Sequence, residues 1–151
     1  PTPLVRTSKL VMVPKNVTKL RSISMEPTSL QFVQQGIKDE LYDYFRNHKI
    51  LSKHIKLEDQ SQNQALAYDG SITNKYATID LSAASDSVSW NLVKYLFAKL
   101  PDLHYWIYAS RSTHTELPDG QTIKLKKFAP MGSALCFPIE TLIFCAIVLL
   151  H

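Results

Sequence analysis

The chain contains 151 residues, of which 45% are hydrophobic and 20% are charged. This composition is typical of a folded protein of about one domain and excludes an intrinsically disordered chain. Seventeen basic and thirteen acidic residues give a net charge of +4, a mild preference for polyanionic partners that is too small to establish nucleic-acid binding.

Two further features narrow the class of protein. Cys136 and Cys145 have no His or Cys partner at zinc spacing, so we expect buried thiols in a reducing compartment. No signal peptide is recognisable, and the apolar stretch 141–150 is shorter than the about 20 residues that cross a bilayer. We therefore expect a buried core helix there and no membrane partner. The chain begins without a Met and ends within this stretch, which predicts a segment of a longer protein.

The first half is predicted to contain two strands and one helix. Residues 4–14 and 20–25 carry strand-like apolar positions, and the stretch 13–16 separates them. A helix is expected after Pro27, with Thr28 or Ser29 as its N-cap and an apolar face running from Leu30 to Phe45. Residues 49–70 are polar and weakly patterned, which predicts a surface connection.

The second half is predicted to alternate strands and helices. A strand at 76–81 and a helix at about 87–100 are followed by the aromatic stretch 103–110, which we expect to pack in the core, with base stacking as the alternative. A hairpin with its turn at Asp119–Gly120 is expected between 113 and 125. The last helix should begin near Gly132–Ser133. This order of elements predicts an α+β fold.

The segment Thr78–Ser89 carries the most informative pattern. Asp80 follows an apolar strand directly, and a strand end holds a carboxylate rigidly, as the binding of a hard divalent cation requires. The small residues 82–85 would let a bulky substrate lie against the backbone. The alternative is a plain strand–turn–helix junction in which Asp86 or Ser87 caps the helix.

Two other segments carry candidate substrate-binding residues. Five cations and no acid occur between Arg6 and Arg21, and such a stretch suits a triphosphate, although it could equally be a solvated basic turn. At Gly132 the backbone could approach a substrate closely, and Ser133 could donate to a ribose or simply begin a helix.

Three segments, in this order along the chain, resemble motifs of one polymerase family. Thr78–Ser89 resembles the first palm motif of the RNA-directed RNA polymerases of the leviviruses, the positive-strand RNA bacteriophages. Val13–Pro27 resembles their basic fingers motif, and Lys127–Ser133, continued by Phe137–Phe144, resembles their second palm motif. The resemblance spans residues 11 to 150.

The resemblance implies a partial right-hand polymerase, with a fingers segment at 1–75 and a palm segment at 76–151. The intact protein would synthesise RNA from nucleoside triphosphates on an RNA template, in the bacterial host cytoplasm, by a two-metal mechanism with Mg2+ or, alternatively, Mn2+. Host translation factors are candidate subunits, as in other family members.

The resemblance also implies roles for individual residues. Asp80 would be the catalytic metal ligand, assisted by the main-chain carbonyl of Leu81, and Asp86 would help to read the ribose 2′ hydroxyl. The implied substrate-binding residues are Lys15, Lys19, Arg21, Asp86, Gly132 and Ser133. At the position of Ser133 the family often carries Asn, and Glu26 is a candidate to orient Arg21.

The family's paired-aspartate hairpin, Gly-Asp-Asp, has no counterpart in these residues, and by family order it should follow His151. We therefore expect half of a catalytic centre and an inactive fragment. Two other interpretations remain open. One is an RNase H-like two-metal nuclease, and the other is a non-catalytic RNA-binding module that makes no use of Asp80.

Overall fold

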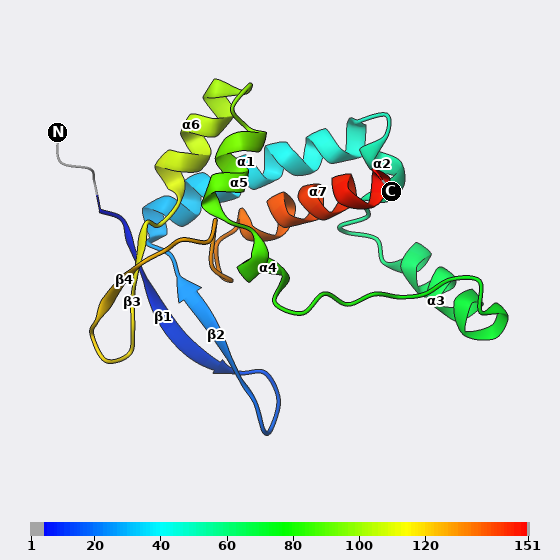
Figure 1. Cartoon of the computed structure of the whole chain (residues 1–151), viewed down its shortest axis with the longest axis horizontal. Coiled ribbons are helices and arrows are strands. Elements are labelled where there is room, and N and C mark those ends of the chain that lie inside the picture. Colours follow the sequence, from blue (N-terminus) through cyan, green and yellow to red (C-terminus); the bar gives the residue numbers. More distant parts are fainter. Residues whose placement is uncertain (1–4, 151) are drawn as a thin grey trace.

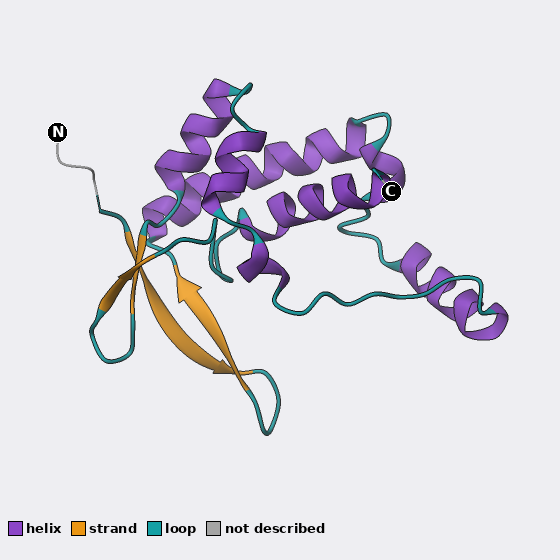
Figure 2. Cartoon of the chain, in the orientation of Figure 1, coloured by secondary structure: helices purple, strands orange, loops and turns teal. Residues whose placement is uncertain are grey.

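The structure is a computed structural model that describes residues 5–150. In this range the chain forms a four-stranded sheet and seven helices (Figure 1). The predicted mixture of strands and helices is confirmed, and sheet and helices occupy separate regions (Figure 2). In chain order the elements are β1 (Thr7–Pro14), β2 (Leu20–Met25), α1 (Thr28–Asn47), α2 (Leu51–His54), α3 (Ser61–Thr73), α4 (Ala84–Ser87), α5 (Trp90–Leu96), α6 (Pro101–Ser110), β3 (His114–Glu116), β4 (Thr122–Lys124) and α7 (Cys136–Leu149).

The sheet has the strand order β2-β1-β3-β4. β1 pairs antiparallel with β2 and parallel with β3, and β3 pairs antiparallel with β4. The strand predicted at 4–14 is observed at Thr7–Pro14, and residue 4 lies outside the described residues. The strand predicted at 20–25 and the predicted hairpin are confirmed, with Gly120 at a φ of 83° in the turn. Because β1 and β3 come from opposite halves of the chain, the sheet ties the two halves together.

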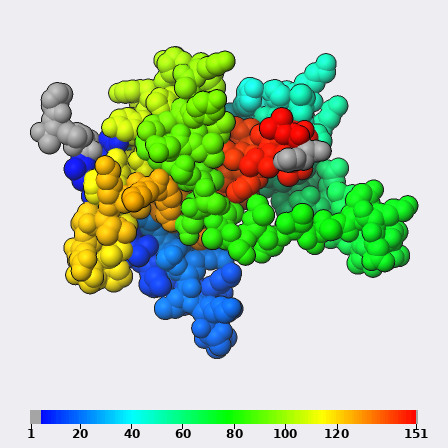
Figure 3. Space-filling view, viewed as in Figure 1, coloured from blue at the N-terminus to red at the C-terminus, as the bar shows by residue number. Residues whose placement is uncertain are grey.

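The hydrophobic core lies among the helices α1, α5, α6 and α7. Each contributes a side chain that is almost completely buried, namely Phe45, Val93, Ile107 and Ile139 in that order. Phe128, from the segment after β4, belongs to the same cluster. The β1–β2 ribbon leaves the helical body and ends in an exposed turn, and α3 protrudes at another side (Figure 3).

The helix α1 begins at Thr28 and has no side-chain cap at its N-terminus. Pro27 occupies the cap position, and its carbonyl accepts a bond from the amide of Gln31 at 2.9 Å. Thr28 and Ser29 are therefore inside the first turn, and the prediction that one of them caps the helix is wrong. Leu41 and Phe45 of the predicted apolar face are buried.

The stretch predicted as a surface connection contains two helices, α2 and α3. All of α3 except Gly70 is exposed, which explains why its sequence shows no apolar face. The predicted strand at 76–81 is wrong, because this segment is irregular and exposed, with Ile79 83% accessible. A strand needs a paired neighbour, and within residues 5–150 the sheet ends at β2 and β4 without reaching this segment.

The predicted helix at 87–100 is shorter than expected. Val88 and Ser89 are extended, because the segment after β4 pairs with them: the amide of Phe128 donates to the carbonyl of Val88 at 2.7 Å, and Ser89 bridges Lys127. Ser89 then caps α5 by accepting a bond from the amide of Leu92 at 3.1 Å. Asp86 and Ser87, the predicted caps, lie in the separate short helix α4.

Three predictions about the second half of the chain need correction. Tyr105, Trp106 and Tyr108 of α6 are exposed and not part of the buried core, although His104 and Tyr108 both stack on Trp90, with ring centroids 5.9 and 6.0 Å away. The stretch 141–150 is only half buried, since its residues from 146 onwards are exposed. α7 begins at Cys136 and not near Gly132, whose φ of 116° is incompatible with a helix. No helix in residues 5–150 is both long and apolar enough to cross a membrane.

Candidate active site

Two adjoining hollows lie between the β1–β2 ribbon and the start of α7. The larger, the turn hollow, has a volume of about 620 Å³ and is lined by the turn Asp80–Ser85, by Lys15 and Arg21, and by Met131, Ser133, Cys136, Phe137 and Glu140. The smaller, the ribbon hollow, has a volume of about 260 Å³. Lys15 and Arg21 line both, and the ribbon hollow adds Asp86 and Lys127.

The turn that presents Asp80 has a fixed backbone shape. Ala83 adopts a left-handed conformation with a φ of 53°, and its carbonyl accepts bonds from the amides of Asp86 and Ser87 at 3.0 and 3.2 Å. The hydroxyl of Ser87 donates to the carbonyl of Ala84 at 2.7 Å. Small side chains are needed here, because an L residue with positive φ tolerates little bulk.

The carboxylate of Asp80 is open to the turn hollow. Asp80 is exposed, and among residues 5–150 its carboxylate forms no hydrogen bond or ion pair. Leu81 lines the same hollow. The structure thus places Asp80 and Leu81 in a hollow that Lys15 and Arg21 of the ribbon and Glu140 of α7 also line, while their role in binding a metal stays a prediction.

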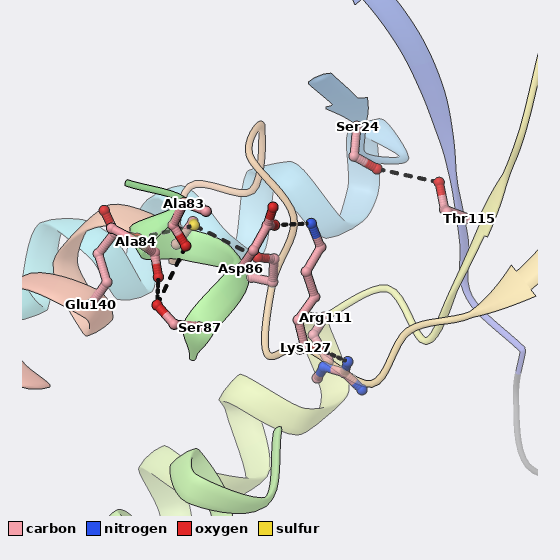
Figure 4. Close-up of polar contacts among 11 residues, drawn as sticks. Ser24, Ala83, Ala84, Asp86, Ser87, Arg111, Thr115, Lys127 and Glu140 are labelled. Carbon is pink, nitrogen blue, oxygen red and sulfur yellow. Dashed lines mark hydrogen bonds and ion pairs between the residues drawn. The ribbon is translucent and has the colours of Figure 1, made fainter. Parts of the chain in front are cut away.

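Asp86 lies on the wall of the ribbon hollow and is paired with a cation that the sequence did not single out. Its Oδ1 is 2.5 Å from the Nζ of Lys127, a contact shown in Figure 4. Asp86 therefore interacts with the segment after β4 and does not cap α5.

The three predicted phosphate-binding cations divide into two groups. Lys15 and Arg21 line both hollows, whereas Lys19 lines neither. Hydrogen bonds close the turn between β1 and β2. The amide of Lys15 donates to the carbonyl of Lys19 at 2.8 Å, and the amide of Lys19 donates to the Oδ1 of Asn16. Lys19 is therefore exposed at the end of the turn, outside both hollows.

Gly132 approaches the chain's own backbone closely. A Cβ at this position would lie 2.2 Å from the carbonyl oxygen of Ser24 in β2, and the amide of Ser24 donates to the carbonyl of Met131 at 2.7 Å. The glycine thus lets the segment before α7 lie directly on the ribbon. Met131, the residue before Gly132, lines both hollows, so this contact fixes the position of one of their walls.

Ser133 is buried, and its hydroxyl is already engaged. It donates to the Oε1 of Gln34 at 2.9 Å, and the Nε2 of Gln34 donates to the carbonyl of Ser110 at 2.8 Å. Gln34 is fully buried and joins α1, α6 and the start of α7. Its signal was present in the sequence, since Gln34 falls on the apolar stripe between Leu30 and Ile37.

Glu26 does not orient Arg21, as was expected, but belongs to a buried cluster behind the ribbon. Its Oε2 accepts a bond from the hydroxyl of Ser112 at 2.5 Å. Burial raises the pKa of Glu26, while Ser112, Gln34 and the charge of Arg111 act in the opposite direction. Burial lowers the pKa of Arg111 to about 10, because burial disfavours the charged form of an acid and of a base alike.

α7 contributes a thiol and a second carboxylate to the turn hollow. The Sγ of Cys136 lies 3.8 Å from an oxygen of Glu140. Burial, with the nearby charge of Glu140, raises the pKa of Cys136 to about 12, so this thiol is not a nucleophile. Burial also raises the pKa of Glu140.

The donors around Asp80 are of the kind that Mg2+ prefers, but they are few. Carboxylate and carbonyl oxygens are available from Asp80, Leu81 and Glu140. Nevertheless, no group of three or more His, Cys, Asp or Glu side chains in residues 5–150 is arranged to hold a metal ion. The described residues therefore do not form a metal site by themselves, and metal binding at Asp80 stays a prediction.

Comparison with known proteins decides the family. Residues 2–149 match the family described as RNA replicase, beta-chain. The chain belongs to this RNA replicase β-chain family. The family resemblance inferred from three sequence motifs is thereby confirmed.

Individual relatives within the replicase family are similar over nearly the whole chain. The RNA-directed RNA polymerase subunit beta of Enterobacteria phage SP is 46% identical over 144 residues, 95% of this chain and 24% of the relative. The corresponding subunit of Escherichia virus Qbeta is 41% identical over 145 residues, 93% and 23% of the two chains. The beta chain of Escherichia phage MS2 is 39% identical over 145 residues, 96% and 25%. The chain thus spans about a quarter of the length of these relatives.

Within this replicase segment, the residues missed by sequence reasoning are those that act through contacts between distant segments. Lys127 was part of a quoted motif, but only its contact with Asp86 makes it stand out. Arg111 follows α6 with no distinguishing pattern around it, yet it is 4% exposed and bonded to main-chain carbonyls. No spacing rule would have selected either residue.

Proposed function

We propose that this chain forms the nucleotide-binding part of an RNA-directed RNA polymerase that copies phage RNA from nucleoside triphosphates. The observation that carries the proposal is that Asp80, Lys15 and Arg21, from motifs about 60 residues apart, line one hollow. Metal-assisted phosphoryl transfer needs carboxylates and cations in one pocket, and this hollow supplies one carboxylate without a partner among the described residues and two cations. The relatives carry the name of this activity.

The division of labour in the proposed fold follows the right-hand polymerase. Residues 1–75 supply the fingers segment, whose ribbon carries Lys15 and Arg21, and residues 76–151 supply the palm segment with Asp80 and Asp86. Both segments share one sheet and one core, which supports a fixed distance between the cations and the carboxylates.

The proposed chemistry assigns a task to each side chain. Lys15 and Arg21 donate charge-assisted hydrogen bonds to the phosphates of the incoming nucleotide and hold it at the turn. Asp86 accepts a hydrogen bond from the 2′ hydroxyl of the ribose. Ser133 and Gly132 shape the wall on which the sugar rests. The hydroxyl of Ser133 donates to Gln34, and this bond holds Ser133 in place.

Asp80, with the main-chain carbonyl of Leu81, would hold a Mg2+ or Mn2+ ion, and such an ion polarises the phosphate and activates the attacking hydroxyl when bound. Further ligands must come from the rest of the polymerase, because the described residues supply an incomplete set. We accordingly propose that the 151-residue chain alone has no polymerase activity.

The proposed partners are the RNA template and product and the nucleoside triphosphates, with host translation factors as further candidate subunits. The proposed location is the bacterial host cytoplasm, where these partners occur. The observed fold gives the two rivals less support. The RNase H-like nuclease interpretation assigns no function to the basic ribbon. The interpretation as a non-catalytic RNA-binding module assigns no function to Asp80.

The proposal is tested in the full-length polymerase that contains this segment, with Lys15→Ala and Arg21→Ala. Each should lower kcat/KM for nucleotide incorporation. The expected loss corresponds to about 1–3 kcal/mol of transition-state stabilisation, the contribution of a hydrogen bond to a charged group. Incorporation kinetics on a primed RNA give the measurement. Lys9→Ala is the matched control, since Lys9 is exposed on β1 and lines neither hollow.

Lys19→Ala should have a smaller effect than either variant, because Lys19 lies outside both hollows. Kinetics unchanged in both Lys15→Ala and Arg21→Ala would return these residues to the interpretation of a solvated basic turn.

A further inference from the structure

The ion pair between Asp86 and Lys127 joins two segments that lie 41 residues apart in the chain. The Asp86 side chain is 59% exposed and that of Lys127 30%, so the pair stands at the wall of the ribbon hollow and not within the core. Figure 4 shows the side chain of Lys127 reaching the carboxylate of Asp86. A ligand in the ribbon hollow would meet both side chains.

The backbone that carries Lys127 is held from two sides. The amide of Phe128 donates to the carbonyl of Val88 at 2.7 Å. On the other side, the buried guanidinium of Arg111 donates to the carbonyls of Lys127 and Phe128 at 3.0 and 2.9 Å and lies 4.7 Å from the ring centroid of Trp90. The main chain at Lys127 is therefore held in place, and the ion pair that its ammonium group forms with Asp86 restrains the Asp86 carboxylate.

The charges around the ribbon hollow suit a ligand that carries both an anionic and a hydroxyl group. Its lining contains three cations, Lys15, Arg21 and Lys127, but Asp86 is its one carboxylate among the described residues. Lys127 engages Oδ1 of this carboxylate. The other oxygen is left to accept a hydrogen bond, and a lysine ammonium keeps two further donors for the ligand.

We infer that Lys127 is a specificity-determining residue that holds the Asp86 carboxylate where its second oxygen accepts a hydrogen bond from the 2′ hydroxyl of an incoming ribonucleotide. This inference rests on the proposed function, since it requires a nucleotide in the hollow. A fixed acceptor discriminates strongly, because a deoxynucleotide leaves it without its hydrogen-bond donor. A carboxylate released from Lys127 can turn towards water and loses this discrimination.

The experiment compares UTP with dUTP on the same primed RNA, using the full-length polymerase. The readout is the ratio of the two kcat/KM values, which a general loss of folded enzyme does not change. Lys127→Gln and Lys127→Met should each lower the ratio about tenfold, equivalent to ~1.4 kcal/mol of discrimination. Lys127→Met keeps the length of the stem, so agreement between the two variants assigns the effect to the charge.

Two further variants serve as controls. Lys126→Gln removes the same charge from the neighbouring residue, which is exposed and forms no ion pair within residues 5–150, and should leave the ratio unchanged. Lys127→Arg keeps a cation at the site and should retain most of the discrimination. A ratio that stays at the wild-type value in both Lys127→Gln and Lys127→Met would overturn the inference.

Asp86→Asn separates this inference from the proposed function. If the ratio falls in Asp86→Asn but not in the Lys127 variants, Asp86 reads the sugar unaided and only the role of Lys127 is lost. If Asp86→Asn also leaves the ratio unchanged, the proposed role of Asp86 fails together with the inference. In the double variant, a ratio equal to that of either single variant is expected, because two residues that act as a unit are not additive.

Discussion

At the scale of a single residue, Gly132 allows the segment before α7 to lie directly against β2. Its φ of 116° lies where residues with a side chain are strained, and its Cα faces the main chain of β2. The amide of Ser24 bonds the neighbouring carbonyl at 2.7 Å. Any side chain here would push the segment before α7 away from the ribbon that carries Lys15 and Arg21.

We predict that Gly132→Ala destabilises the chain by about 2–6 kcal/mol, because positive φ and overpacking against backbone each cost about 1–3 kcal/mol. Urea unfolding followed by circular dichroism gives the measurement. Gly36→Ala is the matched control: Gly36 lies inside α1 with no atom within 4 Å of an added Cβ. It should stabilise the helix by about 1 kcal/mol. Equal stability of the two variants would contradict the close approach at Gly132.

Single residues also mark the limit of what the sequence predicts. Asp80, Lys15 and Arg21 were selected from motif position, and the structure brings them to one hollow. Lys127 and Arg111 were not foreseen, because they act through contacts with segments 16 to 41 residues away. A local pattern contains no information about such contacts.

The clearest lesson at the scale of elements comes from the helix predicted at 87–100. Its spacing is helical, but the segment after β4 pairs with Val88 and Ser89 and keeps them extended. The helix therefore starts later, and Ser89 becomes its cap. The hairpin β3–β4 was predictable because a turn at Asp119–Gly120 is a local signal, whereas the strand at 76–81 lacked a partner among the described residues.

The cap assignment predicts a difference between two neighbouring serines. Ser89→Ala should destabilise the chain by about 1 kcal/mol, since it removes the acceptor for the amide of Leu92. Ser87→Ala is the control, because the Ser87 hydroxyl bonds only carbonyls of its own exposed turn. Thermal unfolding of both variants tests the assignment, and a larger loss in Ser87→Ala would restore the cap predicted from the sequence.

At the scale of the whole molecule, the candidate site exists only because distant segments meet. The ribbon, the turn after Asp80 and the start of α7 each contribute to the turn hollow, and none of them forms a pocket alone. The carboxylates gathered there are too few to hold two metal ions.

We therefore predict that the 151-residue chain incorporates no nucleotide on a primed RNA. Activity above that of a protein-free control, in the presence of Mg2+ or Mn2+, would show that the described residues already contain a complete centre. The longer polymerase, assayed in parallel on the same template, is the positive control.

The central claim is that Asp80 binds the catalytic metal and does not merely support the turn. It is tested most directly by Asp80→Asn in the full-length polymerase, with nucleotide incorporation and filter binding of template RNA measured on one preparation. Asn has the same size but lacks the charge that holds a divalent ion, while template affinity comes mostly from cations that this change leaves in place. Asp69→Asn, on the exposed helix α3, is the matched control and should change neither measurement. We predict that Asp80→Asn abolishes synthesis and leaves template binding within about twofold of the unsubstituted enzyme. Synthesis retained in Asp80→Asn, or synthesis and binding lost together, would contradict the metal assignment.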